Sequence, residues 1–248
     1  MIHYHGGPIT PDTCAIRAWK GRHAFVSFAH TSQLGLASEI CQSFALDNGA
    51  FTFWKTGKEI DWTAYYEFVS DWKNHPRCDF AIIPDVIGMG EGENDRLLEE
   101  WPHGAFGVPV WHMDESDERL IRLANDWPRV AIGSCGEYDV KYPRRCVEKL
   151  RDVLKHIVDD KGYPITKLHG LRMLNKSVFQ HIPLASADST NVARNIGIDK
   201  AWKGAYSPQS KETRASVLVE RIESNNSSSV LNLAETKSTG GIQLGLSF

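Results

Sequence analysis

Three acidic residues each follow a short apolar run of the kind that forms a buried strand. Asp188 ends the run at residues 183–187, Asp85 follows residues 80–84, and Asp47 follows residues 43–46. A carboxylate at the tip of a strand is held in position by the sheet, and this suits it to chemistry. For Asp188 alone, the alternative is a helix cap, because Ser, Thr and Asn residues come next. The repeated arrangement favours a shared site.

Apolar runs alternate with helical patterns along most of the chain. Strands are expected at residues 2–4, 24–28, 43–46, 80–83, 108–111, 130–132, 168–171 and 184–187. Helices are expected at residues 11–20, 32–41, 61–72, 93–101, 120–127, 144–160, 176–181 and 210–223, with a helical segment near Val192. Eight strands alternating with helices predict an α/β fold, a single (β/α)8 TIM barrel. An open doubly wound sheet is the alternative.

The barrel is expected to occupy residues 1–224, followed by a polar linker and C-terminal tail over residues 225–248. Residues 242–248 alternate with a period of two, which would suit an added strand or a partner-binding tail, although a loosely ordered terminus is favoured. No apolar run is long enough for a membrane span, and residues 1–7 do not resemble a signal peptide. We therefore expect a cytoplasmic protein.

Composition excludes several classes of function. The five cysteines are odd in number and widely spaced, and no pair forms a C-x-x-C motif, so neither a disulfide framework nor a cysteine zinc site is indicated. The net charge of −3 argues against a uniformly basic nucleic-acid binder but leaves room for a local basic patch. We predict no metal and no cofactor.

In a barrel the active site lies at the carboxyl ends of the strands, so the three carboxylates would face one cavity. Converging carboxylates can attack an anomeric carbon, move a proton, or accept hydrogen bonds from a ligand edge. Binding of a hard metal such as magnesium ranks second, because metal-ligand spacings are absent. His30, His112 and His169 are expected to be structural or substrate-positioning residues rather than metal ligands.

Several segments, in chain order, resemble the tRNA-guanine transglycosylase superfamily, whose members exchange guanine for a 7-deazaguanine base within a polynucleotide. Residues 46–51 (Leu-Asp-Asn-Gly-Ala-Phe) resemble its Asp-Ser-Gly-Gly-aromatic loop, and residues 81–85 its strand ending in the aspartate that reads guanine. Residues 130–134 resemble the Gly-Gly loop, and residues 168–173 the strand before the nucleophile. Asp188 then falls at the position of the nucleophilic aspartate.

The resemblance implies a pentosyltransferase mechanism. Asp188 would attack the sugar and hold a covalent glycosyl intermediate, and Asp47 would move the proton to and from the bases. Asp85 would accept hydrogen bonds from the guanine pairing edge. Other residues implied to bind the base are Asn48 and Gly49 in the first loop, His112 in place of the family's glutamine, the backbone of Gly133 and Ser134, and Phe51 and Met173 as stacking side chains.

The substrate polymer is less well defined. Residues 198–248 contain no cysteine, whereas the family's tRNA enzymes carry a cysteine-rich zinc site there. The chain is therefore most similar to the compact zinc-free branch that modifies DNA and occurs in phages and bacterial islands, which would place it in a host cytoplasm if phage-encoded. We expect DNA in preference to tRNA as the partner, a 7-deazaguanine base as co-substrate, and either a homodimer or a modification-complex partner.

Basic residues cluster around the last three strand ends, where they could follow a phosphate backbone or form ordinary solvated surface. They are Lys141, Arg144, Arg145, Arg172, Lys176, Arg194, Lys200 and Lys203. Three alternatives remain open for function: a tRNA-guanine transglycosylase, a carboxylate-dependent glycoside or nucleoside hydrolase, and a non-catalytic nucleic-acid-binding subunit of a modification complex.

Overall fold

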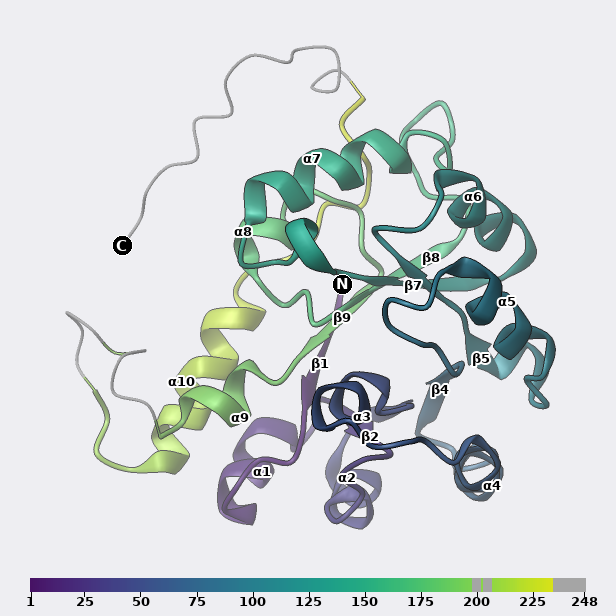
Figure 1. The fold of residues 1–248 in the computed structure, drawn as a ribbon. Coiled ribbons are helices and arrows are strands. Elements are labelled where there is room, and N and C mark those ends of the chain that lie inside the picture. The colour runs from purple at the N-terminus through teal and green to yellow at the C-terminus, as the bar shows by residue number, and fades with distance from the viewer. Residues whose placement is uncertain (198–201, 203–206, 234–248) are drawn as a thin grey trace.

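The computed structural model describes residues 1–197, 202 and 207–233. Its strands are β1 (Ile2–Gly6), β2 (His23–Ser27), β3 (Ser43–Asp47), β4 (Cys78–Ile82), β5 (Gly107–Val108), β6 (Val110–His112), β7 (Arg129–Gly133), β8 (Lys167–Leu171) and β9 (Ser186–Ser189). All pairings are parallel, in the order β5-β4-β3-β2-β1-β9-β8-β7-β6. The strands form a nearly closed barrel (Figure 1). The predicted TIM-like barrel is confirmed.

The strand count is nine rather than eight because Pro109 divides the expected fifth strand. Proline has no N–H to donate to a ladder, so it interrupts a strand at the point where it stands. β5 pairs with β4, and β6 pairs with β7. The Val108 carbonyl accepts from Ile83 on one side, and the Pro109 carbonyl accepts from Ala131 on the other. One interrupted strand therefore contacts both edges of the sheet and nearly closes the barrel.

Helices surround the strands, as Figure 1 shows. The helices among the described residues are α1 (Asp12–Trp19), α2 (Leu34–Ile40), α3 (Ala50–Thr56), α4 (Trp62–Trp72), α5 (Glu91–Glu99), α6 (Asp117–Asp126), α7 (Pro143–Leu154), α8 (Lys176–Phe179), α9 (Asn191–Asn195) and α10 (Lys211–Glu223), with single 3₁₀ turns η1 (Gly104–Phe106) and η2 (Gly136–Tyr138). The unexpected helix is α3, where sequence analysis predicted only a loop. The expected helix at residues 144–160 ends early, at Leu154.

Strand alternation divides the core into an inner and an outer part. Phe25, Ala45, Phe80, Val110 and Ala131 belong to an apolar cluster inside the barrel. The residues between them along each strand belong to two larger clusters that pack the strands against the helices. A side chain two positions beyond an inner residue also faces inward, so the alternation determines which polar residues reach the barrel mouth.

Residues 225–233, predicted as the start of a polar linker, pack against the barrel. The Ser227 hydroxyl donates to the Ile182 carbonyl and accepts from the Leu184 amide. Leu231 is buried, and its amide donates to the Gly162 carbonyl. The expected tail at residues 234–248, including its alternating end at residues 242–248, lies outside the described residues, as do Lys200 and Lys203.

Candidate active site

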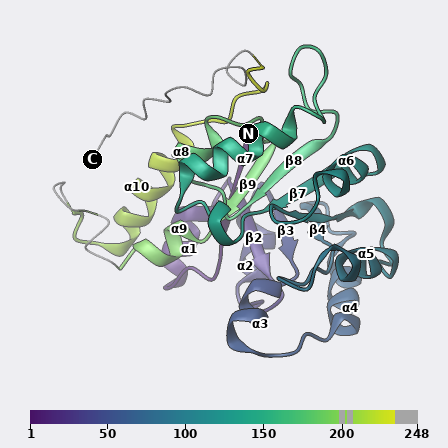
Figure 2. The same ribbon diagram turned by 45° about the horizontal axis from the view of Figure 1, so that its top comes forward.

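The carboxyl end of the barrel interior carries three aspartates. Asp47 lies two positions beyond the inner residue Ala45, at the end of β3. Asp188 lies in β9, and Asp85 follows β4. Because parallel strands end at the same mouth, these side chains come together there. Figure 2 shows β3, β4, β8 and β9 in the central sheet, with helices around them.

Asp47 is electrostatically coupled to the other two carboxylates. Burial, together with the charges of Asp188 and Asp85, raises the pKa of the Asp47 carboxyl to about 7, against hydrogen bonds from Ser27 and Gly49 that lower it. The Gly49 amide donates to Asp47 Oδ2 over 3.2 Å. A carboxyl with a pKa near neutrality can both hold and release a proton, which is the property of a general acid–base catalyst.

Asp188 is 3% exposed and is held by the loop that follows β8. Its Oδ1 accepts a hydrogen bond of 2.8 Å from the Arg172 amide, and its main-chain carbonyl accepts from the Leu174 amide. Arg172 adopts a left-handed backbone conformation with φ of 60°, which is unusual for a residue other than glycine. His169 Nε2 lies 3.4 Å from the same Oδ1. Both contacts therefore fall on one oxygen of the Asp188 carboxylate.

Asp85 forms a buried triad with Asn48 and His112. Asn48 Nδ2 donates to Asp85 Oδ1 over 2.7 Å and to the Ile83 carbonyl over 2.8 Å. His112 Nε2 lies 2.8 Å from Asp85 Oδ2. The Asn48 Oδ1 accepts from the Ala50 amide at the start of α3, which fixes the orientation of the Asn48 side chain. Both oxygens of Asp85 are thus oriented toward fixed partners.

The environment of His112 raises its pKa. Burial lowers the pKa of His112, but the hydrogen bond and charge of Asp85, with the charges of Glu115 and Asp114, outweigh burial and leave the pKa raised. The Glu115 carboxylate also accepts from the His112 amide over 2.8 Å. Gly133 lies directly opposite His112 in the sheet, and a Cβ there would come within 2.7 Å of His112 Nδ1. Glycine at 133 therefore gives the imidazole the space it needs.

An aromatic and cationic pair borders the mouth. The Arg172 guanidinium lies 3.5 Å from the centre of the Phe51 ring, at cation–π distance. Phe51 and Trp54, both on α3, have ring centres 5.7 Å apart and are 37% and 58% exposed. Gly49 starts this helix in a left-handed conformation with φ of 79°. Large exposed rings beside a carboxylate site offer a surface on which a flat ligand could stack.

The structure places the remaining predicted residues as follows. Met173 is fully buried in the outer core, where it packs around Gly170, so the prediction that it stacks on the base is wrong. Ser134 is half-buried beside the mouth. His3 and His5 face outward: their Nε2 atoms lie 2.9 Å from the Asn225 carbonyl and from Glu223 Oε1, respectively. His30 is exposed.

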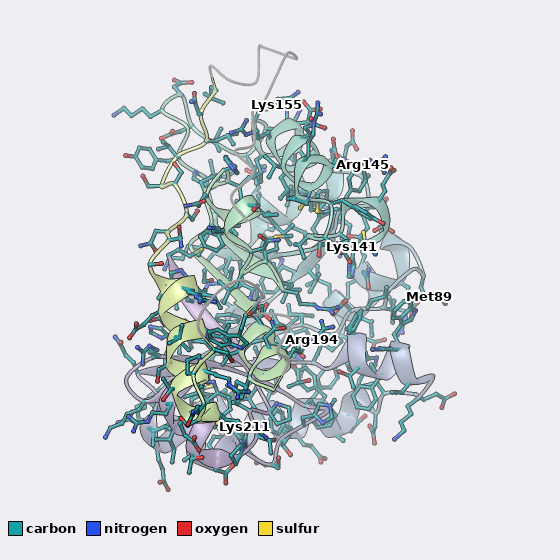
Figure 3. The ribbon with its side chains drawn as sticks, turned by 90° about the vertical axis from the view of Figure 1, so that its left-hand side faces the viewer. Met89, Lys141, Arg145, Lys155, Arg194 and Lys211 are labelled. Carbon is teal, nitrogen blue, oxygen red and sulfur yellow. The ribbon has the colours of Figure 1, made fainter. Side chains whose placement is uncertain are left out.

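The predicted basic rim is exposed but partly ion-paired. Arg144 donates to Glu148 over 2.8 Å, and Arg145 lies 3.7 Å from Glu137. Lys176 and Arg194 are exposed on α8 and α9. Figure 3 shows Lys141 and Arg145 toward the same side of the molecule as Met89, which follows β4.

Sequence analysis missed Ser27 and did not predict how His169 and Arg172 are placed in the site. Ser27 faces inward because it lies two positions beyond the core residue Phe25. His169 faces inward because it lies beside the core residue Ala131 in the sheet. The sequence alone did not determine the register of either residue. Arg172 was expected only as a rim cation, whereas its amide holds Asp188. The signal that could have identified Ser27 is its place in an alternating strand beside Asp47.

Comparisons with known proteins identify no relative: no protein-family model, no curated protein and no solved structure matches this chain. Within the part of the chain that the structure describes, no group of three or more His, Cys, Asp or Glu side chains is arranged to hold a metal ion. No helix in that part is long and apolar enough to cross a membrane.

Proposed function

We propose that the protein is a base-exchange transglycosylase that replaces guanine with a 7-deazaguanine derivative in a nucleic acid. The observation that carries this proposal is the set of three carboxylates at one barrel mouth, with the Asp47 pKa raised to about 7 by burial and by its two neighbours. A reaction at an anomeric carbon needs one carboxylate that attacks the carbon and one carboxyl that exchanges a proton. Asp188 and Asp47 supply this pair.

The reaction proceeds in two displacements. An oxygen of Asp188 attacks the anomeric carbon while the bond from that carbon to the guanine nitrogen breaks, and the departing base takes the proton of Asp47. The incoming base then gives a proton to Asp47, and its nitrogen displaces the Asp188 carboxylate. Two inversions retain the configuration of the sugar. Neither step consumes an oxidant or a nucleoside triphosphate.

Asp85 is suited to read guanine. The pairing edge of guanine presents two adjacent N–H donors, which a carboxylate can accept together. Asn48 and His112 hold Asp85 over distances of 2.7 and 2.8 Å, and each carboxylate oxygen retains a second acceptor position for the base. A proton on His112 Nδ1 would let the imidazole also donate to a base carbonyl. Phe51 and Trp54 would stack on the base or its neighbour.

DNA is the polymer we propose. Arg172 and Lys176 follow β8 in the chain and Arg194 follows β9, and these three residues would contact phosphates. Residues 198–248 lack the cysteines from which the tRNA-modifying branch of the resembled family builds its zinc site. This difference in residues 198–248 supports DNA over tRNA as the proposed substrate.

The test is exchange of labelled guanine into duplex DNA, single-stranded DNA and bulk tRNA, with Asp188→Ala beside the wild type. We expect label in DNA that is lost in the variant. Label in tRNA alone would keep the chemistry and replace the polymer. Release of free base without incorporation would favour the hydrolase alternative. Failure of guanine and of 7-deazaguanine bases in every polymer, with or without a partner protein, would overturn the proposal.

A further inference from the structure

His169 is a buried titratable residue that the mechanism above does not use. It is fully buried inside the barrel, with its ring centre 5.4 Å from that of Phe25 and 5.2 Å from that of Phe80. Its Nδ1 lies 2.8 Å from the Ser186 hydroxyl. Its Nε2 has no hydrogen-bond partner among the described residues and lies 3.4 Å from Asp188 Oδ1.

A buried polar atom without a partner is costly, and proteins retain few of them. The hydroxyl of Ser186 can donate to Nδ1, which leaves the proton of a neutral imidazole on Nε2. That proton then points toward a carboxylate oxygen. The opposite tautomer would direct a lone pair at the negatively charged Asp188. Catalytic hydrogen bonds are often long in a free enzyme and shorten when the substrate binds.

We propose that His169 is the positioning residue of Asp188, in a Ser186–His169–Asp188 chain beneath the barrel mouth. The inference rests on the proposed function for its chemical consequence. The His169 N–H and the Arg172 amide both point toward Oδ1 of Asp188. Their common target leaves Oδ2 as the attacking oxygen.

The donor acts differently on the two displacements. When Oδ2 bonds to the anomeric carbon, Oδ1 becomes the carbonyl oxygen of a glycosyl ester and its negative charge falls. When the incoming base displaces Asp188, the bonding pair returns to the carboxylate and the charge on Oδ1 rises again. A hydrogen bond to Oδ1 is strongest to the charged carboxylate. His169 therefore stabilises Asp188 as a leaving group, and its loss should slow breakdown of the intermediate more than formation.

The barrel contains a matched control for this residue. His23 also faces a serine, with Nδ1 2.8 Å from the Ser43 hydroxyl, and also packs against Tyr4. It stands at the start of β2, at the opposite end of that strand from Ser27 and the aspartates. His23→Leu removes an imidazole and a serine hydrogen bond without changing the mouth.

The first experiment reads the contact directly, by nitrogen NMR of the full chain labelled at its histidines. His169 is assigned by the signals lost in His169→Gln. We expect the proton on Nε2, and an Nε2 signal that moves in Asp188→Asn but not in Asp79→Asn. A proton on Nδ1, or an Nε2 signal unaffected by Asp188→Asn, would overturn the inference whether or not the exchange reaction is found.

The second experiment compares exchange of labelled guanine in whichever of duplex DNA, single-stranded DNA or tRNA the wild type uses. His169→Leu should lower kcat about tenfold with an unchanged KM for the polymer, the factor expected for a hydrogen bond to a charged group. The fraction of enzyme holding the covalent adduct should rise. His169→Gln, which keeps a donor, should recover most of kcat, and His23→Leu should match the wild type per folded molecule. An unchanged kcat and adduct fraction in His169→Leu would contradict the inference while leaving the proposed function intact.

Discussion

The two ends of the barrel surround their carboxylates with different neighbours. At the amino end, Asp79 accepts a hydrogen bond from the Tyr4 hydroxyl, and its Oδ2 lies 3.5 Å from Arg129 Nη1. The Arg129 guanidinium also lies 4.3 Å from the centre of the Phe80 ring. At the carboxyl end, Asp47 has two other carboxylates as neighbours and receives hydrogen bonds from a hydroxyl and a backbone amide.

The difference separates stability from chemistry. At the amino end, burial raises the pKa of Tyr4, so its phenol stays a neutral donor to Asp79. At the carboxyl end, burial and like charges bring the Asp47 pKa to about 7, so both protonation states are populated near neutral pH. Barrel proteins keep function at the carboxyl end and stabilising interactions at the other. The polar residues of this chain divide in the same way.

The sharpest contrast concerns activity. Asp188→Asn removes the nucleophilic charge but keeps an oxygen that can accept from the Arg172 amide. We expect base exchange to fall by about 10³-fold or more, because the attacking group itself is lost. The unfolding temperature should stay close to that of the wild type, because the substitution also removes repulsion among three neighbouring carboxylates. A variant that unfolds early would instead assign Asp188 a role in stability.

The pH dependence of stability tests the raised pKa of Asp47. The folded-state pKa of Asp47, about 7, exceeds its ordinary value of 3.8, so between these values the native state binds the extra proton. The free energy of unfolding should therefore fall as the pH rises from about 4 to about 7, by at most about 4 kcal/mol, and stay low above that.

In Asp47→Asn this contribution disappears. The urea midpoint of the variant should exceed that of the wild type at about pH 8 and approach it at about pH 4. Curves that run parallel across this range would show that Asp47 has an ordinary pKa and would remove the main support for its acid–base role.

A substitution at the amino end of the barrel should lower stability without changing activity. Asp79→Ala leaves the buried Tyr4 hydroxyl without its acceptor and Arg129 without its ion-pair partner. We expect a loss of about 1–3 kcal/mol in the free energy of unfolding, measured by urea denaturation. Exchange per folded molecule should not change. A drop in kcat in the folded fraction would contradict the division between the two ends.

The smallest expected effect tests how His112 is placed. Gly133→Ala adds a Cβ that would lie 2.7 Å from His112 Nδ1, so the imidazole must shift, and we expect this shift to disturb its hydrogen bond to Asp85. We expect about a tenfold loss in kcat/KM for the polymer, the factor associated with one displaced hydrogen bond in a site. Gly35→Ala is the matched control, because nothing lies within 4 Å of a Cβ there. Equal activity in the two variants would show that His112 does not orient Asp85.

The sequence contains enough to predict the barrel and the aspartates. Asp47, Asp85 and Asp188 stand after apolar runs, and the alternation of strands and helices brings strand ends to one mouth. The proton affinity of Asp47 could not be predicted, because it depends on distances between residues far apart in the chain. The division of the fifth strand at Pro109 was missed, although proline is a known strand breaker.

Side-chain direction was the main limit. A shift of one residue in register turns every side chain of a strand to the other face, so sequence alone could not orient His169. The family resemblance implied that Met173 stacks on the base, yet Met173 lies in the core directly after the left-handed residue Arg172. The turn there aims the Arg172 amide at Asp188. The left-handed residue of that turn is an arginine rather than a glycine or asparagine, so the sequence contains no sign of this conformation.

The most direct test of the central claim is mass spectrometry of the wild-type enzyme quenched in acid during exchange of guanine in its polymer. The mechanism predicts that the peptide containing Asp188 carries one glycosyl adduct, which is absent from Asp188→Asn. Exchange that proceeds without an adduct on that peptide, or with the adduct on the peptide containing Asp47, would contradict the assignment of Asp188 as the nucleophile.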